Sequence, residues 1–344
     1  MAERWLRRTG TARRGFEYIR PDGSAVRDAR TLERIHKLRV PPAWRDVHLA
    51  PDSRRSIQAW GFDARGRKQY RYHERAVARR ELRKYHRVRQ LAKTLPRIRR
   101  ALRHQSHHEE LSCPTACAIA LRLISESLFR PGSERYLKEN RTYGMTTLRK
   151  RHVSIADGQA VFTFTGKSRK ANRQVVTNHE LLSLIRRLQR TPGARLFRYR
   201  SSAGWSDLNA ATLSAYLRRH IGPFAVKDFR TWGGTLRAAT VLAEFGPART
   251  PTEAKRNVAL AMRIVSSELG NTPAICRSSY VHPMVVARYL DSGETIDLRR
   301  VRRRHLASAD AFAHSPEERA LIAFLDRHFP ERRRVPRTVM ARAA

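Results

Sequence analysis

The stretch from residue 268 to residue 283 contains a tyrosine, Tyr280, whose hydroxyl can serve as a nucleophile. Gly270 suits the position just after a helix, so the amphipathic helix before it is expected to end there. Thr272-Pro273 then predicts an extended turn, because a residue followed by proline disfavours helix. Arginines beside such a tyrosine would stabilise its phenolate form. Taken alone, the pattern favours an ordinary core or surface tyrosine, so other parts of the sequence must decide.

Three further stretches supply charged residues that could act together with a tyrosine. They are Leu128–Asn140 with Arg130, Phe164–Lys167 ending in a Gly-Lys pair, and Lys227–Gly233 with Arg230. An arginine guanidinium can hold two phosphate oxygens at once and keeps its proton. Preorganised charge of this kind stabilises a transition state that gains negative charge. The stretches point to chemistry on a phosphate group, although any one arginine in so basic a chain can be a solvated surface charge.

Together these four stretches resemble the small type IB DNA topoisomerases, the poxvirus and bacterial form. That family has an Arg before a Tyr-Leu-Lys-Glu-Asn segment, then Gly-Lys on a hairpin, then Lys-Asp-(Leu/Phe)-Arg-Thr. A Gly-(His/Asn)-Thr-Pro segment follows and leads to the nucleophilic Tyr. All of these occur here in order, and Pro41–Trp44 and Gly66–Tyr72 add a further match. The resemblance covers about residues 15 to 290.

The resemblance implies a role for each of five residues. Tyr280 is expected to attack a phosphodiester and form a phosphotyrosyl bond, which is covalent catalysis that conserves the bond for resealing. Arg130 and Arg230 are expected to hold the phosphate. Lys167 is expected to act as the general acid that protonates the leaving 5′-oxygen. Asn271, where many members have His, is expected to donate a neutral N–H to a phosphate oxygen.

Two of these roles have plainer alternatives that the residues leave open. A lysine is a reluctant proton donor unless neighbouring arginines make it a better acid. Lys167 can therefore be a turn lysine or a simple phosphate contact, and Ser168 after it stands where poxvirus members carry an acid. Asn271 can simply end its helix, a position that suits Asn.

Basic and aromatic residues interleave in two places, as they do on nucleic-acid-binding surfaces. The resemblance puts the first group on a strand of an N-terminal domain and the second on a helix that enters the major groove. Gln69 can read adenine, and lysine or arginine can read guanine. Contact with phosphates alone, without base reading, is an equal alternative. The expected DNA-binding residues are Lys68, Gln69, Tyr70, Arg71, Tyr72, Arg135, Tyr136, Lys138 and Lys227.

The charge of the chain agrees with a polyanionic partner. The 344 residues include 71 Lys plus Arg and 30 Asp plus Glu, a net charge of +41. Such an excess destabilises a compact fold through self-repulsion, which a bound polyanion relieves. Nucleic acid is favoured over a membrane, because the longest apolar run, Ala116–Leu121, is too short to span a bilayer. No signal peptide is visible, so a cytoplasmic, nucleoid-associated protein is expected.

The cysteines and the histidine cluster do not indicate a metal site. Cys113, Cys117 and Cys276 are too few for a disulfide framework and fit a reducing compartment. Cys113 and Cys117 can share one helix face, but a second ligand pair is missing, so buried thiols are expected rather than zinc. The same holds for the histidines in 104–108. No metal and no cofactor is expected.

Hydrophobic periodicity and turn residues predict a strand-rich beginning and a mainly helical remainder. Residues 1–14 are expected to be frayed, and a tail from residue 331 is expected to be disordered and basic. Expected hairpins pair 16–20 with 25–26 and 57–62 with 68–72. Expected strands lie at 145–148, 153–156, 160–165 and 173–177, with a tight turn at Asp157-Gly158. Expected helices lie at 31–38, 74–104, from Pro114 onward, 179–190, 208–220, 234–244, 252–269, 284–291 and from Ser315 to near 329.

These elements predict an α+β fold in two domains. Residues 1–80 are expected to form a small β-rich N-terminal DNA-clamp domain. Residues 81–344 are expected to form a larger, mainly α catalytic domain with a basic C-terminal tail. The resemblance implies that this second domain is of the type IB topoisomerase and tyrosine recombinase kind.

The resulting functional prediction is a type IB DNA topoisomerase. A monomer would clamp duplex DNA, especially supercoiled DNA, nick one strand through a 3′-phosphotyrosyl link, let the free end swivel and reseal, without ATP or metal. A tyrosine recombinase or integrase is the nearest alternative; it usually has His-x-x-Arg upstream of the tyrosine, which 263–270 lacks, and a helical N-terminal domain. A non-enzymatic basic DNA-binding protein is the other alternative, and it would not need Tyr280.

Overall fold

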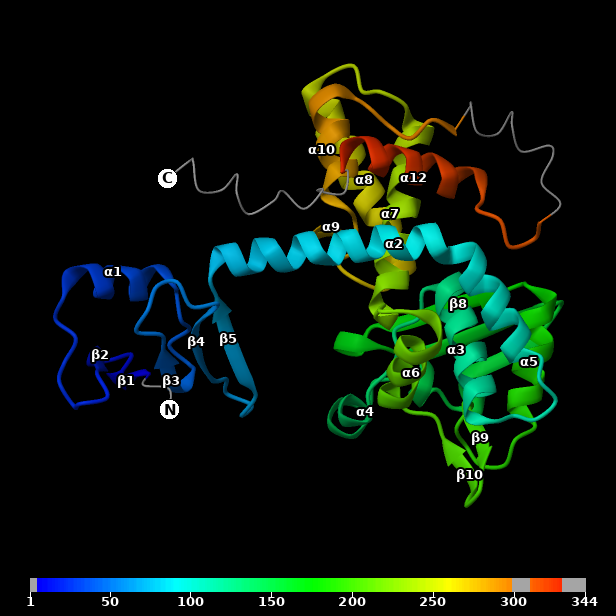
Figure 1. The fold of residues 1–344 in the computed structure, drawn as a ribbon, viewed down its shortest axis with the longest axis horizontal. Coiled ribbons are helices and arrows are strands. Elements are labelled where there is room, and N and C mark those ends of the chain that lie inside the picture. Colours follow the sequence, from blue (N-terminus) through cyan, green and yellow to red (C-terminus); the bar gives the residue numbers. More distant parts are fainter. Residues whose placement is uncertain (1–4, 299–309, 330–344) are drawn as a thin grey trace, which may run out of the picture. The chain divides into compact units, whose positions relative to one another are not determined.

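The computed structural model describes residues 5–298 and 310–329. The chain divides into two units, Met1–Lys84 and Tyr85–Ala344, and each is described here by itself (Figure 1). A small sheet dominates the first unit and helices dominate the second. The expected α+β class, with a small β-rich part before a larger, mainly helical part, is confirmed.

The first unit is built on a five-stranded antiparallel sheet in the order β2-β1-β3-β4-β5. Its core contains Leu6, Val47, Leu49 and Ala59 from the strands and Ile35 from the helix α1. The expected hairpin of 57–62 with 68–72 is confirmed residue for residue. The elements are β1 (Leu6–Thr11), β2 (Gly15–Ile19), α1 (Ala29–Lys37), β3 (Arg45–Leu49), β4 (Ile57–Phe62) and β5 (Lys68–Tyr72).

The start of the chain differs from the expectation. Fraying is wrong for residues 6–11, which form β1 and pair with β2, whereas residues 1–4 and the expected tail from 331 lie outside the described residues. The hairpin of 16–20 with 25–26 is confirmed only in a short form, as an antiparallel bridge between Ile19 and Ala25 and a bond from the Val26 N–H to the Tyr18 carbonyl at 2.8 Å. Gly10 and Gly15 make the pairing of β1 with β2 possible. Both have positive φ, and a Cβ on Gly10 would collide with the Gly15 carbonyl, so only glycine fits the turn.

The second unit packs helices around a three-stranded antiparallel sheet, β6-β7-β8, and carries a separate β9–β10 hairpin. The strands are β6 (Val153–Ala156), β7 (Gln159–Thr165), β8 (Ala171–Val176), β9 (Arg198–Ser201) and β10 (Gly204–Asp207). The helices are α2 (Glu74–Ser106), which begins in the first unit, α3 (Cys113–Ser127), α4 (Glu134–Asn140), α5 (His179–Gln189), α6 (Ala210–Tyr216), α7 (Val226–Phe245), α8 (Pro251–Leu269), α9 (Pro273–Ser279), α10 (Pro283–Ser292) and α12 (Pro316–His328). Both Asp157 and Gly158 have positive φ, so the predicted tight turn between β6 and β7 is confirmed.

Three local expectations are wrong in ways that matter for the site. Residues 145–147 form a 3-10 helix rather than a strand. Helix α7 begins at Val226, eight residues before the expected start. The segment after Thr272 is not an extended turn, because only Thr272 itself is extended; it caps α9, and Pro273 is the first helical residue.

A buried ion pair fixes the start of α7, and a second ion pair accepts a hydrogen bond from Trp232 of α7 at 3.5 Å. Asp228 in its first turn is fully buried, caps the helix through the Ala225 N–H, and accepts two hydrogen bonds of 2.6 and 2.9 Å from Arg87 of α2. Glu318 of α12 binds Arg99 of α2 at 2.6 and 3.0 Å. Burial opposes the charge on Glu318, but the bonds from Arg99 outweigh it and lower the pKa of that carboxyl. The helix is therefore a rigid support.

The three cysteines are free thiols, two of them buried. Cys117 and Cys276 are buried, Cys113 is half-buried, and burial raises the pKa of the Cys117 thiol. Across residues 5–298 and 310–329, no cluster of three His, Cys, Asp or Glu side chains is arranged to hold a metal ion. Over the same residues, no helix is long and apolar enough to cross a membrane.

Candidate active site

Four of the five predicted catalytic residues come together in the second unit. Arg130 follows α3, Arg230 lies in α7, Asn271 lies in the turn after α8, and Tyr280 ends α9. They approach from segments that are 150 residues apart in sequence (280 − 130). Backbone carbonyls hold the two arginine side chains in place, and a glycine lets the Tyr280 backbone pack closely.

Arg230 is held by two helix ends. Its Nη2 donates to the Leu269 carbonyl, at the end of α8, at 2.9 Å, and its Nη1 donates to the Leu128 carbonyl, after α3. The side chain is 3% exposed. Its guanidinium carbon lies 5.1 Å from the centre of the Tyr280 ring. Arg230 is thus locked beside the tyrosine by groups that cannot take its proton.

Arg130 joins the same place from the other side. Its Nη2 donates to the Gly270 carbonyl at 2.9 Å and also to Oδ1 of Asn271. The second bond orients the Asn271 amide: Oδ1 is taken by Arg130, so Nδ2, with its two N–H groups, points elsewhere. This orientation suits the predicted role of Asn271 as a donor better than the role of a simple helix-ending residue.

Three buried N–H groups at the site are left without a partner. Among the described residues, Nε of Arg130, Nε of Arg230 and Nδ2 of Asn271 make no hydrogen bond. A buried donor without a partner costs about 1–3 kcal/mol. Three such donors, on two arginines that interact with Tyr280 and on the asparagine bonded to one of them, indicate a place for an oxyanion. A phosphate group offers several acceptor oxygens.

The electrostatics also favour an anion. The pKa of Arg230 is lowered to about 10, chiefly by burial and also by the nearby charge of Arg130, while Tyr280 opposes both effects. Burial likewise lowers the pKa of Arg130, again against Tyr280. Both guanidiniums remain protonated at neutral pH. An anion placed between them would relieve their mutual repulsion.

Tyr280 is positioned by the end of α9 and by a glycine of α7. Its N–H donates to the Cys276 carbonyl at 2.9 Å. A Cβ on Gly234 would lie 3.0 Å from the Tyr280 carbonyl oxygen and 3.4 Å from its Cβ, so the tyrosine backbone rests directly on the helix. The ring is half-buried rather than sealed in the core.

Lys167 is not brought to the other four residues in this structure. It is exposed in the short turn between β7 and β8, and no described hydrogen bond or ion pair joins it to the site. Its neighbour Lys170 does reach the site, because its Nζ donates to the Asn271 carbonyl at 3.4 Å. The hairpin is therefore adjacent to the site, and the general-acid role of Lys167 stays a prediction.

Two site residues escaped the sequence analysis. Lys170 had no signal beyond its place in a basic turn. Gly234 had one, because Gly233 and Gly234 together weaken a helix and need a reason such as close packing. A Cβ on Gly233 would collide with Leu128. Gly233 therefore lets Leu128 pack against α7, and Gly234 lets the Tyr280 backbone do so.

The predicted DNA-binding residues of β5 lie on two faces of the N-terminal sheet. Lys68, Tyr70 and Tyr72 are exposed, and the two tyrosine rings stack with centroids 5.9 Å apart. Gln69 and Arg71 are half-buried on the opposite face. Of the five residues predicted to bind DNA from β5, only Lys68, Tyr70 and Tyr72 therefore share one exposed face of the sheet.

The two residues on the opposite face already have partners within the first unit. Gln69 donates to Asp63 at 2.9 Å, and Arg71 donates to the Arg39 carbonyl at 2.8 Å. Bonds from Arg67, the turn backbone and Gln69 lower the pKa of Asp63 to about 2. Gln69 would have to leave this acceptor before it could read a base.

The predicted major-groove helix is α4, whose residues are exposed or half-buried. Tyr136 and Lys138 are exposed, and Arg135 pairs with Glu139 at 2.7 Å along the helix. Lys227, in the first turn of α7, is also exposed. Tyr136 and Lys138 are therefore accessible to a partner from α4.

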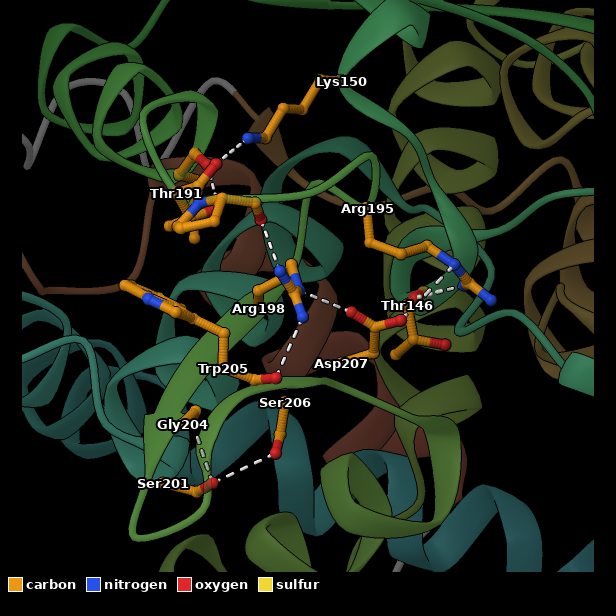
Figure 2. A network of polar contacts seen from close by, with 12 residues as sticks. Thr146, Lys150, Thr191, Arg195, Arg198, Ser201, Gly204, Trp205, Ser206 and Asp207 are labelled. Carbon is orange, nitrogen blue, oxygen red and sulfur yellow. Dashed lines mark hydrogen bonds and ion pairs between the residues drawn. The ribbon is translucent and has the colours of Figure 1, made fainter.

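Helix α4 is attached through Arg195. This arginine donates to Glu134 of α4 at 2.7 Å and to the Thr146 carbonyl at 3.2 Å. Figure 2 shows Arg195 beside Arg198 and Asp207, the pair that closes the β9–β10 hairpin at 2.7 Å. The hairpin and α4 are therefore linked through a single polar network.

Comparisons with known proteins show the family of the chain. A family model described as the catalytic core of eukaryotic DNA topoisomerase I matches residues 67–303, more than half of the chain. The chain belongs to the type IB DNA topoisomerase family. It is an enzyme, an isomerase that acts on DNA. A second family model, described as the N-terminal domain of bacterial DNA topoisomerase IB, matches residues 15–63.

Viral relatives extend the match over most of the chain. The chain is 32% identical to DNA topoisomerase 1B of Acanthamoeba polyphaga mimivirus over 288 residues, which are 81% of this chain and 86% of the relative. It is 23% identical to DNA topoisomerase 1B of Vaccinia virus (strain Copenhagen) over 238 residues, 67% of this chain and 72% of the relative. The recognition of the family from its motifs is confirmed.

Replacing Asn271 by Ala is expected to slow strand cleavage by up to about 10²–10³-fold, the loss that follows removal of one oxyanion donor. Asn271→His keeps a donor and should stay active, but its imidazole titrates, so the rate should vary with pH between about 5 and 8. The measurement is single-turnover cleavage against pH. Asn271→Asp is the matched control, because it keeps Oδ1 and the shape but loses the donor. An Ala variant as fast as the native enzyme would leave Asn271 as a helix end only.

Proposed function

We propose that Tyr280 is the nucleophile of the topoisomerase reaction. Its phenol loses its proton to solvent, and Oη forms a bond to the scissile phosphorus. The bond from phosphorus to the 5′-oxygen breaks, and this oxygen takes a proton from Lys167. The product is a 3′-phosphotyrosyl link and a free 5′-hydroxyl.

Resealing runs the same steps backward. The 5′-hydroxyl, after the broken strand has swivelled, attacks the phosphotyrosyl link and restores the phosphodiester. One phosphodiester replaces another in each direction, so the reaction needs no ATP. Arg130, Arg230 and Asn271 would stabilise the extra negative charge of the transition state in both directions.

The observation that carries this proposal is the set of three buried donors without a partner. The Nε atoms of Arg130 and Arg230 and Nδ2 of Asn271 are buried without a partner in the described part of the chain. Both arginines interact with Tyr280, and Asn271 is bonded to Arg130. Donors arranged before the substrate arrives cost no reorganisation during the reaction. A structural tyrosine would not need three such donors, and a DNA-binding protein without activity would not need to bury them.

The proposal extends to the substrate. A monomer would clamp duplex DNA, with Lys68, Tyr70 and Tyr72 contacting it from the first unit and Tyr136 and Lys138 from the second. Supercoiled DNA would be the physiological substrate, and the enzyme would work on the nucleoid in the cytoplasm. The net charge of +41 supports strong phosphate contact.

Purified enzyme is expected to relax both positively and negatively supercoiled plasmid in EDTA and without ATP. Agarose gels of relaxation products over time measure this. Mobility shift on linear duplex DNA, in the same buffer, shows whether the protein binds. Binding without relaxation of either plasmid would favour the non-enzymatic alternative and overturn the proposed mechanism.

Lys167→Ala is expected to cleave an ordinary substrate slowly and a substrate with 5′-sulfur at the scissile position nearly as fast as the native enzyme. A thiolate leaves without the proton that an alkoxide needs, so the general acid becomes dispensable. Single-turnover cleavage of both substrates measures the effect. Lys170→Ala is the neighbouring control and should show no such selective rescue. Equal slowing of Lys167→Ala on both substrates would make Lys167 a phosphate contact only.

A further inference from the structure

A row of three alternate residues, Lys170, Asn172 and Gln174, lies along the turn that carries Asn271. At one end of this row, Gln174 donates to the Glu268 carbonyl at 3.0 Å. At the other end, Lys170 donates to the Asn271 carbonyl at 3.4 Å. The row reflects the two-residue period of a strand, whose other side chains are exposed here. The hairpin that carries Lys167 is thus laid against the end of α8.

Asn172, in the middle of this row, fills the space between two glycines. It is 8% exposed, and its Nδ2 donates to the Lys170 carbonyl at 2.8 Å. A Cβ on Gly166 would collide with its Nδ2, and a Cβ on Gly270 would lie 2.6 Å from its Oδ1. Gly166 directly precedes Lys167, and Gly270 directly precedes Asn271. One buried amide therefore touches the residues before two predicted catalytic side chains.

The two sides of this contact are not equally anchored. The turn at Gly270 is also held by Arg130, which binds the Gly270 carbonyl at 2.9 Å. The hairpin tip is closed by two bonds to the Lys170 carbonyl, from the Gly166 N–H and from Asn172, both at 2.8 Å. Ser168 and Arg169 in the tip have φ of 62° and 57°, a conformation that costs energy outside glycine. Loss of Asn172 would therefore release the tip and leave the turn in place.

We propose that Asn172 is a positioning residue, which sets the place of Lys167 relative to Asn271 and the scissile phosphate. The proposal rests on the general-acid role proposed for Lys167. Asn172 does not touch DNA or the reacting atoms; it acts by keeping the hairpin in register with the turn at Gly270. A misplacement of about 1 Å at a catalytic group can cost about 10²-fold in rate.

Asn172→Ala is expected to slow cleavage of an ordinary duplex by about 10–100-fold. On the 5′-sulfur substrate it should cleave nearly as fast as the native enzyme, because the proton from Lys167 is no longer needed. The double variant Asn172→Ala/Lys167→Ala should be no slower than Lys167→Ala on the ordinary substrate, since residues that act through one another are not additive. Val175→Ala, with its side chain on the opposite face of the same strand, is the control and should keep the native rate.

The outcomes separate this proposal from the one on which it rests. Equal slowing of Asn172→Ala on both substrates, or a double variant slowed by the product of the two single effects, would overturn the positioning role. If Lys167→Ala itself is not rescued by sulfur, the acid role of Lys167 fails, and the double variant alone still decides whether Asn172 acts through Lys167. Should Asn172→Ala not fold, Asn172→Asp keeps the shape, loses the N–H to the Lys170 carbonyl, and is expected to show the same pattern.

Discussion

Tyr280→Phe is expected to bind DNA with native affinity and to form no covalent adduct. The substitution removes only the phenolic oxygen, and the ring still fills the space beside Arg230 and Gly234. Loss of a covalent nucleophile lowers the rate by at least about 10⁴-fold. Single-turnover cleavage of a labelled duplex, with the adduct trapped in detergent, measures the loss. Filter binding of the same duplex measures the affinity.

Tyr289→Phe is the matched control for this variant. The Tyr289 hydroxyl donates to the Gly246 carbonyl at 2.8 Å and accepts from Asn257, far from the arginine pair in sequence. Its removal should lower the free energy of unfolding by about 1 kcal/mol, because a half-buried carbonyl loses its donor, and should leave the cleavage rate unchanged. A Tyr280→Phe variant that still forms adduct would remove Tyr280 from the mechanism.

Arg230→Ala is expected to lose more than about 10³-fold in cleavage, beyond the 10²–10³-fold that one neutral oxyanion donor is worth. The variant loses a formal charge next to the phosphate and the donor Nε together. Sulfur at the 5′ position should not restore the rate, because charge stabilisation is needed whichever group leaves. Single-turnover cleavage of both substrates separates Arg230 from Lys167.

Arg230 also has a structural task, so its replacement must be controlled. The Leu128 and Leu269 carbonyls would each lose a buried donor, at a cost of about 1–3 kcal/mol each in the free energy of unfolding. Arg230→Lys keeps the charge but lacks the planar fork that joins two carbonyls and a phosphate, and should remain slow. Thermal unfolding of both variants shows whether the protein is folded. A folded Arg230→Ala with the native rate would make the residue purely structural.

The order of short motifs was enough to predict the family, the α+β class and the helices and strands with strong periodicity. The Gly-Lys pair, the Lys-Asp-Phe-Arg-Thr segment and the path from Asn271 to Tyr280 are chemical patterns that survive in the order of the residues. Hairpin β4–β5 and the helix from Ser315, whose hydroxyl caps α12 by accepting from the Glu318 N–H, were predicted because their signals are local. A turn needs its glycine, and a cap needs its hydroxyl, wherever the rest of the chain lies.

The tertiary structure alone decided how the site is held. Whether Arg230 stands on a helix depended on the contact of Asp228 with Arg87, 141 residues away, which starts α7 earlier than its apolar pattern indicates. The orientation of Asn271 depended on Arg130. The role inferred for Asn172 depended on Gly166 and Gly270, two glycines that lie far from each other in the sequence. Sequence patterns report spacing along the chain, whereas unpaired donors and the absence of room for a Cβ arise only when separate segments meet.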